Sequence, residues 1–361
     1  MGVKVAVVGA TGAVGQEMRR QLVSRNLPLA GDPVFLASER SAGKRLPWGD
    51  GDIEVQAISP EAFDGVDIAL FSAGGARSKQ WAPIAAERGA VVIDNSSAFR
   101  MDADVPLVVA EVNPGAAARR PRGIIANPNC TTMVLMVAVK PLHDSFGLTD
   151  AVTTSYQAAG GAGQSGITEL IDQARVLVDD ADRMRVDGVA AEDAAADAVA
   201  DAVTPSAFSK PIAFNVLAHC GSFTEARYTD EEWKLANESR KILDLPALRV
   251  SPTCVRVPVV VGHGIAARLT FSRPVTRDEA VQALTGAPGL EIVDGTGQDG
   301  EVLAYPTPLA SAGRDEVLVG RIREDLGDPH SINLWVVGDN LLKGAALNAV
   351  QLAELVASET T

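Results

Sequence analysis

Apolar residues in the first third of the chain form short continuous runs of strand length. These runs lie at Val3–Val8, Val34–Ala37, Ile68–Ser72 and Val91–Asp94. The stretches Gln16–Ser24 and Ser78–Arg88 between them have the spacing of helices. Strands that are apolar on both faces and alternate with helices are typical of a parallel sheet with helices on both sides. We therefore predict an N-terminal α/β domain with a doubly wound parallel sheet.

The pattern changes after Cys130. An apolar helix is predicted over Thr131–Val139, closed by Pro141. The later strands are longer and more alternating, at Ala151–Ala158, Cys254–Val261, Ala266–Ser272, Glu316–Arg323 and Ser331–Val337. They predict an α+β domain whose mixed or antiparallel sheet has helices on one face. A last apolar helix, Leu341–Val356, is expected to pack back on the first domain. We therefore expect one domain from residues 1–130 plus 341–361 and a second from 131–340.

Composition excludes several classes of protein. The chain has 361 residues, 47% of them hydrophobic, which is enough for two packed domains. Its formal net charge of −14 is a poor match to a polyanion, so we expect no nucleic acid as partner. Met133–Val139, the longest strongly apolar stretch, is too short to cross a membrane. We expect Asp187–Val203, rich in alanine and acids, to be a solvated surface excursion, either a helix or a mobile insertion.

The three cysteines, Cys130, Cys220 and Cys254, form no CxxC pair and have no zinc-ligand spacing. We expect neither a metal site nor a disulfide scaffold, and a reducing cytoplasmic location. Cys130 alone follows an Asn-Pro-Asn turn and opens an apolar helix. A helix N-terminus stabilises a thiolate, so we predict a lowered thiol pKa and a nucleophile there. The alternative is a buried, inert cysteine, the role we expect for Cys220 and Cys254.

The first strand runs into the turn Gly9-Ala10-Thr11-Gly12-Ala13-Val14-Gly15. Glycines at such a turn let a pyrophosphate approach the N-terminus of the following helix. The spacing is GxxGxxG rather than GxGxxG, so a purely structural turn is the alternative. The position of the motif, directly after a buried strand, favours a Rossmann-like dinucleotide-binding domain.

The end of the second strand bears on the choice between NAD and NADP. An acid there accepts a hydrogen bond from the ribose 2′-hydroxyl of NAD, whereas an arginine with serines holds the 2′-phosphate of NADP. Glu39 argues for NAD, and Ser38, Arg40 and Ser41 argue for NADP. We favour NADP, with an ordinary solvated loop as the alternative.

Further motifs follow one another in a specific order. They are Gly9–Gly15, Asn95–Arg100, Asp104–Asn113, Asn127–Cys130, Gln157–Gly163, Glu231–Lys234, Arg256–Val259 and Gly338–Ala346. With this ordered set, the chain resembles the aspartate-semialdehyde dehydrogenase family from its first strand to its final helix. The resemblance implies reversible, NADPH-dependent reductive dephosphorylation of L-aspartyl-4-phosphate to L-aspartate-4-semialdehyde, on the pathway to lysine (through diaminopimelate), threonine and methionine. It also implies a homodimer built through the second domain.

The resemblance implies a role for each matching residue. Cys130 would be the acyl-thioester nucleophile, His263 the general acid/base, and Gln157 would orient the substrate at the reacting carbon. Arg256 would hold the substrate α-carboxylate and Glu231 its α-ammonium. A phosphate site would consist of Arg100, Asn129 and Lys234. NADP would be bound by Gly9, Thr11, Gly12, Ala13, Val14, Ser38, Arg40, Ser41, Ser72, Ala73, Gly74, Gly160, Gly161 and Asn340.

The residues by themselves leave some of these roles open. A lone histidine such as His263 is usually structural. Arg256 and His263 are seven apart, so one unbroken strand would point them to opposite faces, and Pro258 or Gly262 must bend or bulge the chain. Glu231 and Lys234 share one face of a helix predicted to end at Leu243, where an ordinary surface ion pair is the alternative.

Two other functions remain open. One is a related acyl-phosphate or acyl-CoA reductase, such as N-acetyl-glutamyl-phosphate reductase. The other is a non-catalytic dinucleotide-binding sensor that keeps the fold. Thiol labelling separates the sensor from an enzyme, because an activated Cys130 should be alkylated much faster than Cys220 or Cys254.

Overall fold

The computed structural model describes residues 2–179, 181–200, 206–295 and 304–359. Its N-terminal sheet has the order β5-β2-β1-β6-β7-β8, and all of its neighbouring strands are parallel. These strands are β1 (Val5–Val8), β2 (Val34–Ala37), β5 (Gln56–Ala57), β6 (Ile68–Phe71), β7 (Val91–Asp94) and β8 (Ile124–Ala126). The predicted parallel sheet is confirmed.

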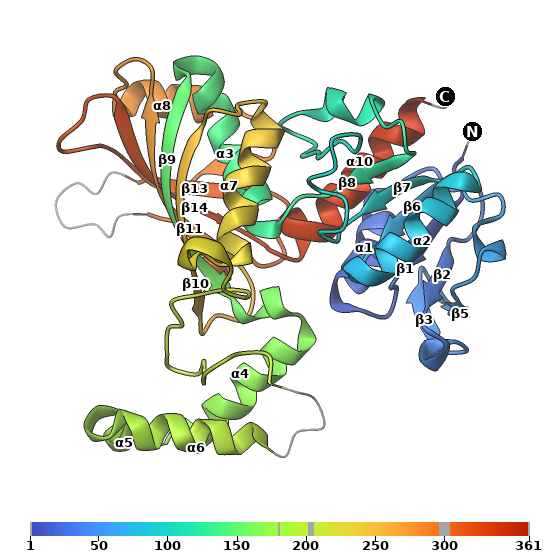
Figure 1. Ribbon diagram of the computed structural model, residues 1–361, viewed down its shortest axis with the longest axis horizontal. Coiled ribbons are helices and arrows are strands. Elements are labelled where there is room, and N and C mark those ends of the chain that lie inside the picture. Colours follow the sequence, from blue (N-terminus) through green and yellow to red (C-terminus); the bar gives the residue numbers. More distant parts are fainter. Residues whose placement is uncertain (1, 180, 201–205, 296–303, 360–361) are drawn as a thin grey trace.

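Helices cover both faces of this sheet, as a doubly wound fold requires. On one face α1 (Ala13–Ser24) and α10 (Leu347–Glu359) contribute Met18 and Val350 to a shared core. On the other face α2 (Gly75–Glu87) packs through Ala82 and Ala85. Figure 1 shows α10 in red against the blue N-terminal elements, so the C-terminal helix returns to the first sheet.

The second sheet has the order β10-β9-β11-β14-β13-β12. Its strands are β9 (Leu148–Ala158), β10 (Arg249–Val257), β11 (His263–Phe271), β12 (Leu290–Ile292), β13 (Val317–Glu324) and β14 (Ser331–Gly338). β10 is parallel to β9 and β12 to β13, whereas the pairs β9–β11, β11–β14 and β13–β14 are antiparallel. The predicted mixed sheet is therefore confirmed.

One face of the second sheet packs against three helices, α3 (Cys130–Phe146), α7 (Asp230–Leu243) and α8 (Arg277–Leu284). The opposite face is covered by described residues only in part, where Trp335 Nε1 donates to the Pro306 carbonyl (2.9 Å). It presents Val152, 44% exposed, and Tyr156, 38% exposed, with Trp335 packed edge-on against Tyr156. This second layer leaves an open, partly apolar sheet face.

The segment around residue 190 forms part of a helical excursion that projects away from both sheets (Figure 1). It consists of α4 (Gln164–Leu177), α5 (Ala181–Val186) and α6 (Gly188–Ala200). Ala191 and Ala195 of α6 are buried in a small core of their own with Leu170 and Leu177, so α6 is more than a solvated surface stretch. Residues 201–203 of the predicted segment lie outside the described residues.

Three predicted boundaries are wrong. Helix α3 continues through Pro141 because Leu142 and Phe146 beyond it are packed in the core, and it ends at Gly147 with φ 72°. Strand β10 ends at Val257 rather than Val261. The last helix begins as a π-helical turn, Leu342–Ala346, and becomes α-helical only from Leu347. A π-helical turn is a local insertion that apolar periodicity alone does not reveal.

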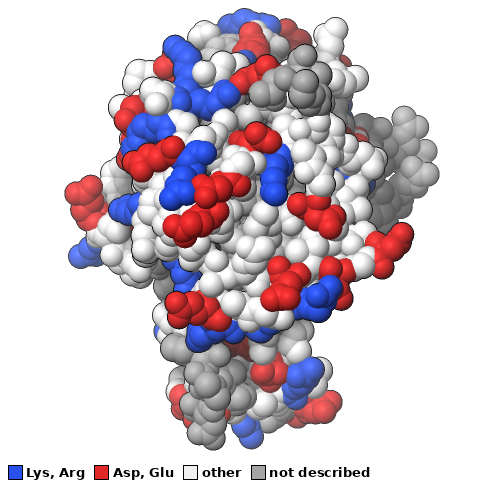
Figure 2. Space-filling model, turned by 90° about the vertical axis from the view of Figure 1, so that its right-hand side faces the viewer, with Lys and Arg blue, Asp and Glu red and all other residues white. Residues whose placement is uncertain are grey.

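The remaining elements are short. They are β3 (Arg45–Trp48), β4 (Gly51–Glu54), α9 (Pro308–Ser311) and single turns at Glu39–Ser41, Glu61–Phe63, Pro114–Ala118, Ala159–Ala162 and Glu225–Arg227. No helix in the described part of the chain is long and apolar enough to span a bilayer. Basic and acidic side chains are interspersed on the face shown in Figure 2.

Candidate active site

Three neighbouring strands place Arg256, Gln157 and His263 close together. In the parallel β9–β10 pair Arg256 lies directly opposite Gln157, so both side chains are on one face of the sheet. β11 runs on the other side of β9 and begins at His263. Residues 258–262 carry the chain across the end of β9, with Gly262 at φ 95°. The predicted bend is confirmed, since Arg256 and His263 lie on different strands.

Helix α3 brings Cys130 to this face. The Asn129 side chain caps the helix, because its Oδ1 accepts hydrogen bonds from the amides of Thr131 (3.0 Å) and Thr132 (3.4 Å). The Cys130 Sγ lies 3.3 Å from His263 Nε2. On its other side the His263 ring accepts a hydrogen bond at Nδ1 from the Ala158 amide (3.1 Å). The neutral imidazole therefore carries its proton on Nε2 and directs it at the sulfur.

The predicted lowering of the Cys130 pKa is wrong. Burial, and after it the negative charge of Glu231, raise the pKa of the thiol to about 11, and the positive charges of Arg256 and Arg100 partly oppose that rise. Burial also lowers the pKa of His263 to about 3, with Arg256 acting in the same direction. Desolvation here outweighs the helix dipole. The pair is therefore a neutral thiol beside a neutral imidazole at neutral pH.

Gly161 follows β9 and leaves room for Arg256 and His263. A Cβ atom at this position would stand 2.6 Å from Arg256 Nη1 and 3.2 Å from His263 Cε1. Arg256 is 8% exposed, and its Nη1 donates to the Ala158 carbonyl (2.9 Å). Asn340 supports the same region by accepting from the Gly262 amide (2.9 Å). A glycine at 161 is thus required by the close approach of these side chains.

Helix α7 contributes the predicted pair of charges. Lys234 Nζ donates to Glu231 Oε2 (3.2 Å) and to Asp230 Oδ2 (2.6 Å), which confirms that Glu231 and Lys234 share a face. Glu231 Oε1 accepts from Asn129 Nδ2 (2.8 Å) and from Gln157 Nε2 (3.4 Å). The pair is therefore joined to the amide side chains around Cys130 and is more than a surface ion pair.

Arg100 is held in a buried arrangement that sequence reasoning missed. Its Nη1 donates to Glu238 Oε1 (3.1 Å), and its Nε and Nη2 donate to the carbonyls of Asn127 and Asn95 (both 2.9 Å). Glu238 Oε2 accepts from the Asn129 amide (2.7 Å). Glu238 lies four residues after Lys234, hence on the same face of α7, and that spacing is the signal that could have identified it.

These side chains surround one cavity of about 430 Å³. Among the predicted residues, its lining includes Cys130, Gln157, Arg256, Glu231, Arg100, Asn129, Lys234, Ala13, Val14, Gly160, Gly161 and Asn340. His263 is fully buried behind Cys130. The structure thus brings the predicted catalytic, substrate and phosphate residues together with part of the predicted cofactor set.

The other predicted cofactor residues lie along one edge of the N-terminal sheet. Strands β2, β1 and β6 are neighbours, and their carboxyl ends meet at this edge. They are followed by Gly9, Thr11 and Gly12 after β1, by Ser38, Arg40 and Ser41 after β2, and by Ser72, Ala73 and Gly74 after β6. Gly9 has φ 86°, and a Cβ there would stand 2.2 Å from the Ser72 carbonyl oxygen. Ala13 and Val14, at the start of α1 beside this edge, also line the Cys130 cavity.

Known proteins agree with this arrangement. Residues 4–119 match the family described as semialdehyde dehydrogenase, NAD binding domain, and residues 139–343 match its dimerisation domain. The aspartate-semialdehyde dehydrogenase of Streptomyces akiyoshiensis is 50% identical over 358 residues, which cover 99% of each chain. The chain belongs to the aspartate-semialdehyde dehydrogenase family. The resemblance seen in the ordered motifs is therefore confirmed.

Solved structures of the aspartate-semialdehyde dehydrogenase family have the same fold. Aspartate semialdehyde dehydrogenase II from Vibrio cholerae matches with a TM-score of 0.89 and 42% identity over 100% of both chains, and a second structure of it is complexed with ASA. The Candida albicans enzyme, solved with NADP, matches with a TM-score of 0.74 and 25% identity over 100% of this chain and 99% of that one.

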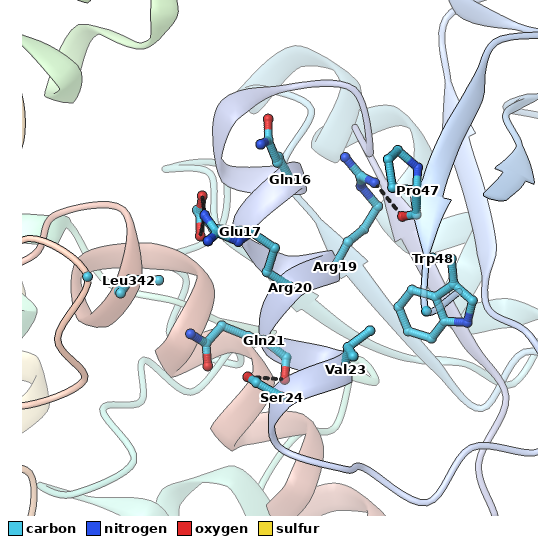
Figure 3. A pocket seen from close by; sticks show the side chains of 12 residues that line it. Gln16, Glu17, Arg19, Arg20, Gln21, Val23, Ser24, Pro47, Trp48 and Leu342 are labelled. Carbon is cyan, nitrogen blue, oxygen red and sulfur yellow. Dashed lines mark hydrogen bonds and ion pairs between the residues drawn. The ribbon is translucent and has the colours of Figure 1, made fainter. Parts of the chain in front are cut away.

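A second cavity, of about 570 Å³, lies over the outer side of α1 and contains none of the residues predicted for the family (Figure 3). Arg19 reaches from α1 toward the β3–β4 hairpin and donates to the Pro47 carbonyl (2.9 Å), and Ser24 Oγ donates to the Gln21 carbonyl (3.3 Å). These contacts are structural. Among the described residues, no group of three or more His, Cys, Asp or Glu side chains is placed to hold a metal ion.

Proposed function

We propose that the chain reduces L-aspartyl-4-phosphate to L-aspartate-4-semialdehyde and inorganic phosphate, reversibly and with NADPH. The observation that carries the proposal is the contact between Cys130 Sγ and His263 Nε2 (3.3 Å) in a cavity that also holds separate basic groups. A nucleophilic sulfur, an N–H donor and two anion sites are the groups that acyl transfer from an acyl phosphate requires.

In the biosynthetic direction the Cys130 thiolate attacks the acyl carbon. A C–S bond forms, the bond between the acyl carbon and the phosphate oxygen breaks, and the phosphate leaves with both electrons and takes up one proton, which balances the proton that the Cys130 thiol loses. Lys234 and Arg100 line the cavity and would stabilise the charge that develops on the phosphate. A bound NADPH would supply a hydride to the thioester carbon, and uptake of one proton from solvent would complete the thiohemiacetal. As the thiohemiacetal collapses, its hydroxyl proton is released, its C–S bond breaks and the aldehyde forms. His263 Nε2–H donates a hydrogen bond that stabilises the expelled Cys130 thiolate.

Two anions are held at two separate places. Arg256 on β10 would pair with the α-carboxylate, which remains attached to the substrate. Arg100, which follows β7, would bind the phosphate that enters and leaves, together with Asn129 and Lys234. Glu231 lies between these sites, joined to Lys234 (3.2 Å) and Gln157 (3.4 Å). A carboxylate there favours a free α-ammonium over a neutral N-acetyl group, which argues against the N-acetyl-glutamyl-phosphate alternative.

The residues at the carboxyl edge of the N-terminal sheet fit NADP. The β1–α1 turn has the glycine geometry that lets a pyrophosphate approach the N-terminus of α1. Arg40, exposed beyond β2, would take the 2′-phosphate with Ser38 and Ser41. The NADP complex of the similar Candida albicans structure supports the same choice.

The open face of the second sheet supports a homodimer. Val152 and Tyr156 are exposed on it, and a sheet face of this kind is covered in a stable assembly. We assign residues 1–130 plus 341–361 to the NADP-binding domain and 131–340 to the substrate and dimerisation domain. A reducing compartment, the cytoplasm, would keep the Cys130 thiol free for catalysis.

The test is phosphate-dependent reduction of NADP with L-aspartate semialdehyde, with NAD and other aldehydes measured in parallel. Turnover that requires both phosphate and this aldehyde supports the proposal. Turnover with coenzyme A in place of phosphate would favour an acyl-CoA reductase. A protein that binds NADP without turning over any aldehyde, and whose Cys130 is alkylated no faster than Cys220, would be a sensor.

A further inference from the structure

The amide nitrogen of Gln157 has no donor left for a substrate. An amide NH₂ group has two hydrogens to donate. In Gln157 one faces Ser155 Oγ (3.3 Å) and the other faces Glu231 Oε1 (3.4 Å). Gln157 lines the Cys130 cavity but is only 1% exposed, so little of its amide faces the open space. The residue that would orient the reacting group thus donates both amide hydrogens to protein acceptors.

Asn129 is held in a similar way. Its Oδ1 caps α3, and its Nδ2 donates to the same Glu231 oxygen (2.8 Å). Glu231 Oε1 therefore accepts from the side-chain amides of both residues that flank the Cys130 thiol, one before it in the chain and one on β9. The other carboxylate oxygen, Oε2, accepts from Lys234 (3.2 Å). The Glu231 carboxylate thus accepts hydrogen bonds from Gln157, Asn129 and Lys234.

The charges around Glu231 show what could displace those amides. Lys234 is shared with Asp230 (2.6 Å), and Arg100 is paired with Glu238 (3.1 Å), so neither cation is reserved for Glu231. An ammonium group that reached Glu231 would form a charge-assisted hydrogen bond, stronger than the long contact from the neutral Gln157 amide. It would also cancel the negative charge that raises the pKa of the Cys130 thiol.

We propose that Glu231 restrains the site until a substrate with a free α-ammonium binds. The ammonium takes the place of the Gln157 N–H at Glu231 Oε1, and the released N–H turns to the oxygen of the reacting acyl group. The amino group of the substrate is then required for the chemical step as well as for binding. This inference rests on the proposed reaction and makes Glu231 a positioning residue that acts through Gln157 and Cys130.

Turnover of succinate semialdehyde, which lacks only the α-ammonium, tests the restraint. Wild-type protein should turn it over with a low kcat even at saturation. Glu231→Ala should raise that kcat roughly tenfold or more, the factor of one added hydrogen bond to a charged oxygen, while lowering kcat/KM for L-aspartate semialdehyde. Asp230→Ala, the adjacent acid that contacts Lys234 but neither amide, should give no such gain. If Glu231 only binds the ammonium, Glu231→Ala leaves the kcat for succinate semialdehyde unchanged, and the restraint is refuted.

Alkylation of Cys130 by iodoacetamide tests the same point without turnover. Adding L-alanine, which carries the ammonium and carboxylate, should accelerate alkylation of the wild type, whereas propionate should not. In Glu231→Ala, Cys130 should be alkylated fast even without L-alanine or propionate. Glu231→Gln preserves the shape of the side chain, and its alkylation rate should lie between those of the wild type and Glu231→Ala. Equal effects of L-alanine and propionate would overturn the inference. If the wild-type protein shows no phosphate-dependent turnover with any aldehyde, the proposed reaction is refuted. The alkylation rates still test the inference in that case, because they do not depend on turnover.

Discussion

The ion pair between Arg100 and Glu238 should be among the most sensitive contacts in the protein. The two side chains are 9% and 1% exposed, and Arg100 Nη1 lies 3.1 Å from Glu238 Oε1. The second carboxylate oxygen accepts from the Asn129 amide at 2.7 Å. Glu238→Ala would leave the buried Arg100 guanidinium without its counter-charge, although its bonds to two carbonyls remain, and would leave the Asn129 amide without its acceptor.

Removing one partner of a buried pair costs roughly 3–5 kcal/mol, because the remaining charge stays desolvated. For a protein of 361 residues we expect the thermal midpoint to fall by about 4–7 °C. Glu238→Gln keeps the volume and one acceptor for the Asn129 amide, so its loss should be smaller. The exposed pair of Arg249, 72% exposed, with Asp150 serves as the control. Arg249→Ala should cost no more than about 1 kcal/mol.

Thermal unfolding followed by circular dichroism measures these differences, and steady-state kinetics gives their effect on the site. Because Glu238 holds Arg100, the KM for phosphate should rise in Glu238→Ala more than the KM for NADP. If Glu238→Ala melts within about 1 °C of the wild type, an intact buried ion pair is the wrong description of this contact. If all Michaelis constants rise together, Arg100 does not serve phosphate in particular.

Four other outcomes are expected. Cys130→Ser should abolish phosphate-dependent turnover and retain NADP binding, since His263 Nε2 already carries its proton and cannot take one from a serine hydroxyl, which is far less acidic than a thiol; wild-type turnover would exclude the thioester. Arg40→Ala should weaken NADP by roughly 1.5–3 kcal/mol with little effect on NAD in equilibrium titrations, and equal weakening would place Arg40 elsewhere. Arg256→Ala should raise the KM for semialdehyde more than that for phosphate and Arg100→Ala the reverse, with Arg256→Lys also poor because an ammonium lacks the bidentate geometry; proportional changes in both constants would refute two anion sites. The rate of Cys130 alkylation in the ligand-free protein should keep rising as the pH passes 9, because burial raises the thiol pKa to about 11 and the reactive thiolate accumulates only as that pKa is approached; a plateau near pH 7 would contradict this.

Local patterns in the sequence were sufficient for the elements that carry the site. The apolar runs at Val34–Ala37 and Val91–Asp94 coincide with β2 and β7, since a strand buried on both faces needs continuous apolar residues. The helix start at Cys130 and the shared face of Glu231 and Lys234 also follow from neighbours in the chain. These features depend on backbone geometry over a few residues, which a sequence specifies directly.

Only the tertiary structure decided how these elements act on one another. Cys130 meets His263 across 133 residues, and Arg100 meets Glu238 across 138. The sequence placed the thiol at a helix N-terminus and so predicted a lowered pKa, but burial and Glu231 raise it. Helix α3 likewise continues past Pro141 because Leu142 and Phe146 beyond it are buried in the core. Desolvation and ion pairing depend on atoms contributed by distant segments. The magnitude of a pKa shift is therefore fixed only when the folded chain has buried the group and brought its charged neighbours close.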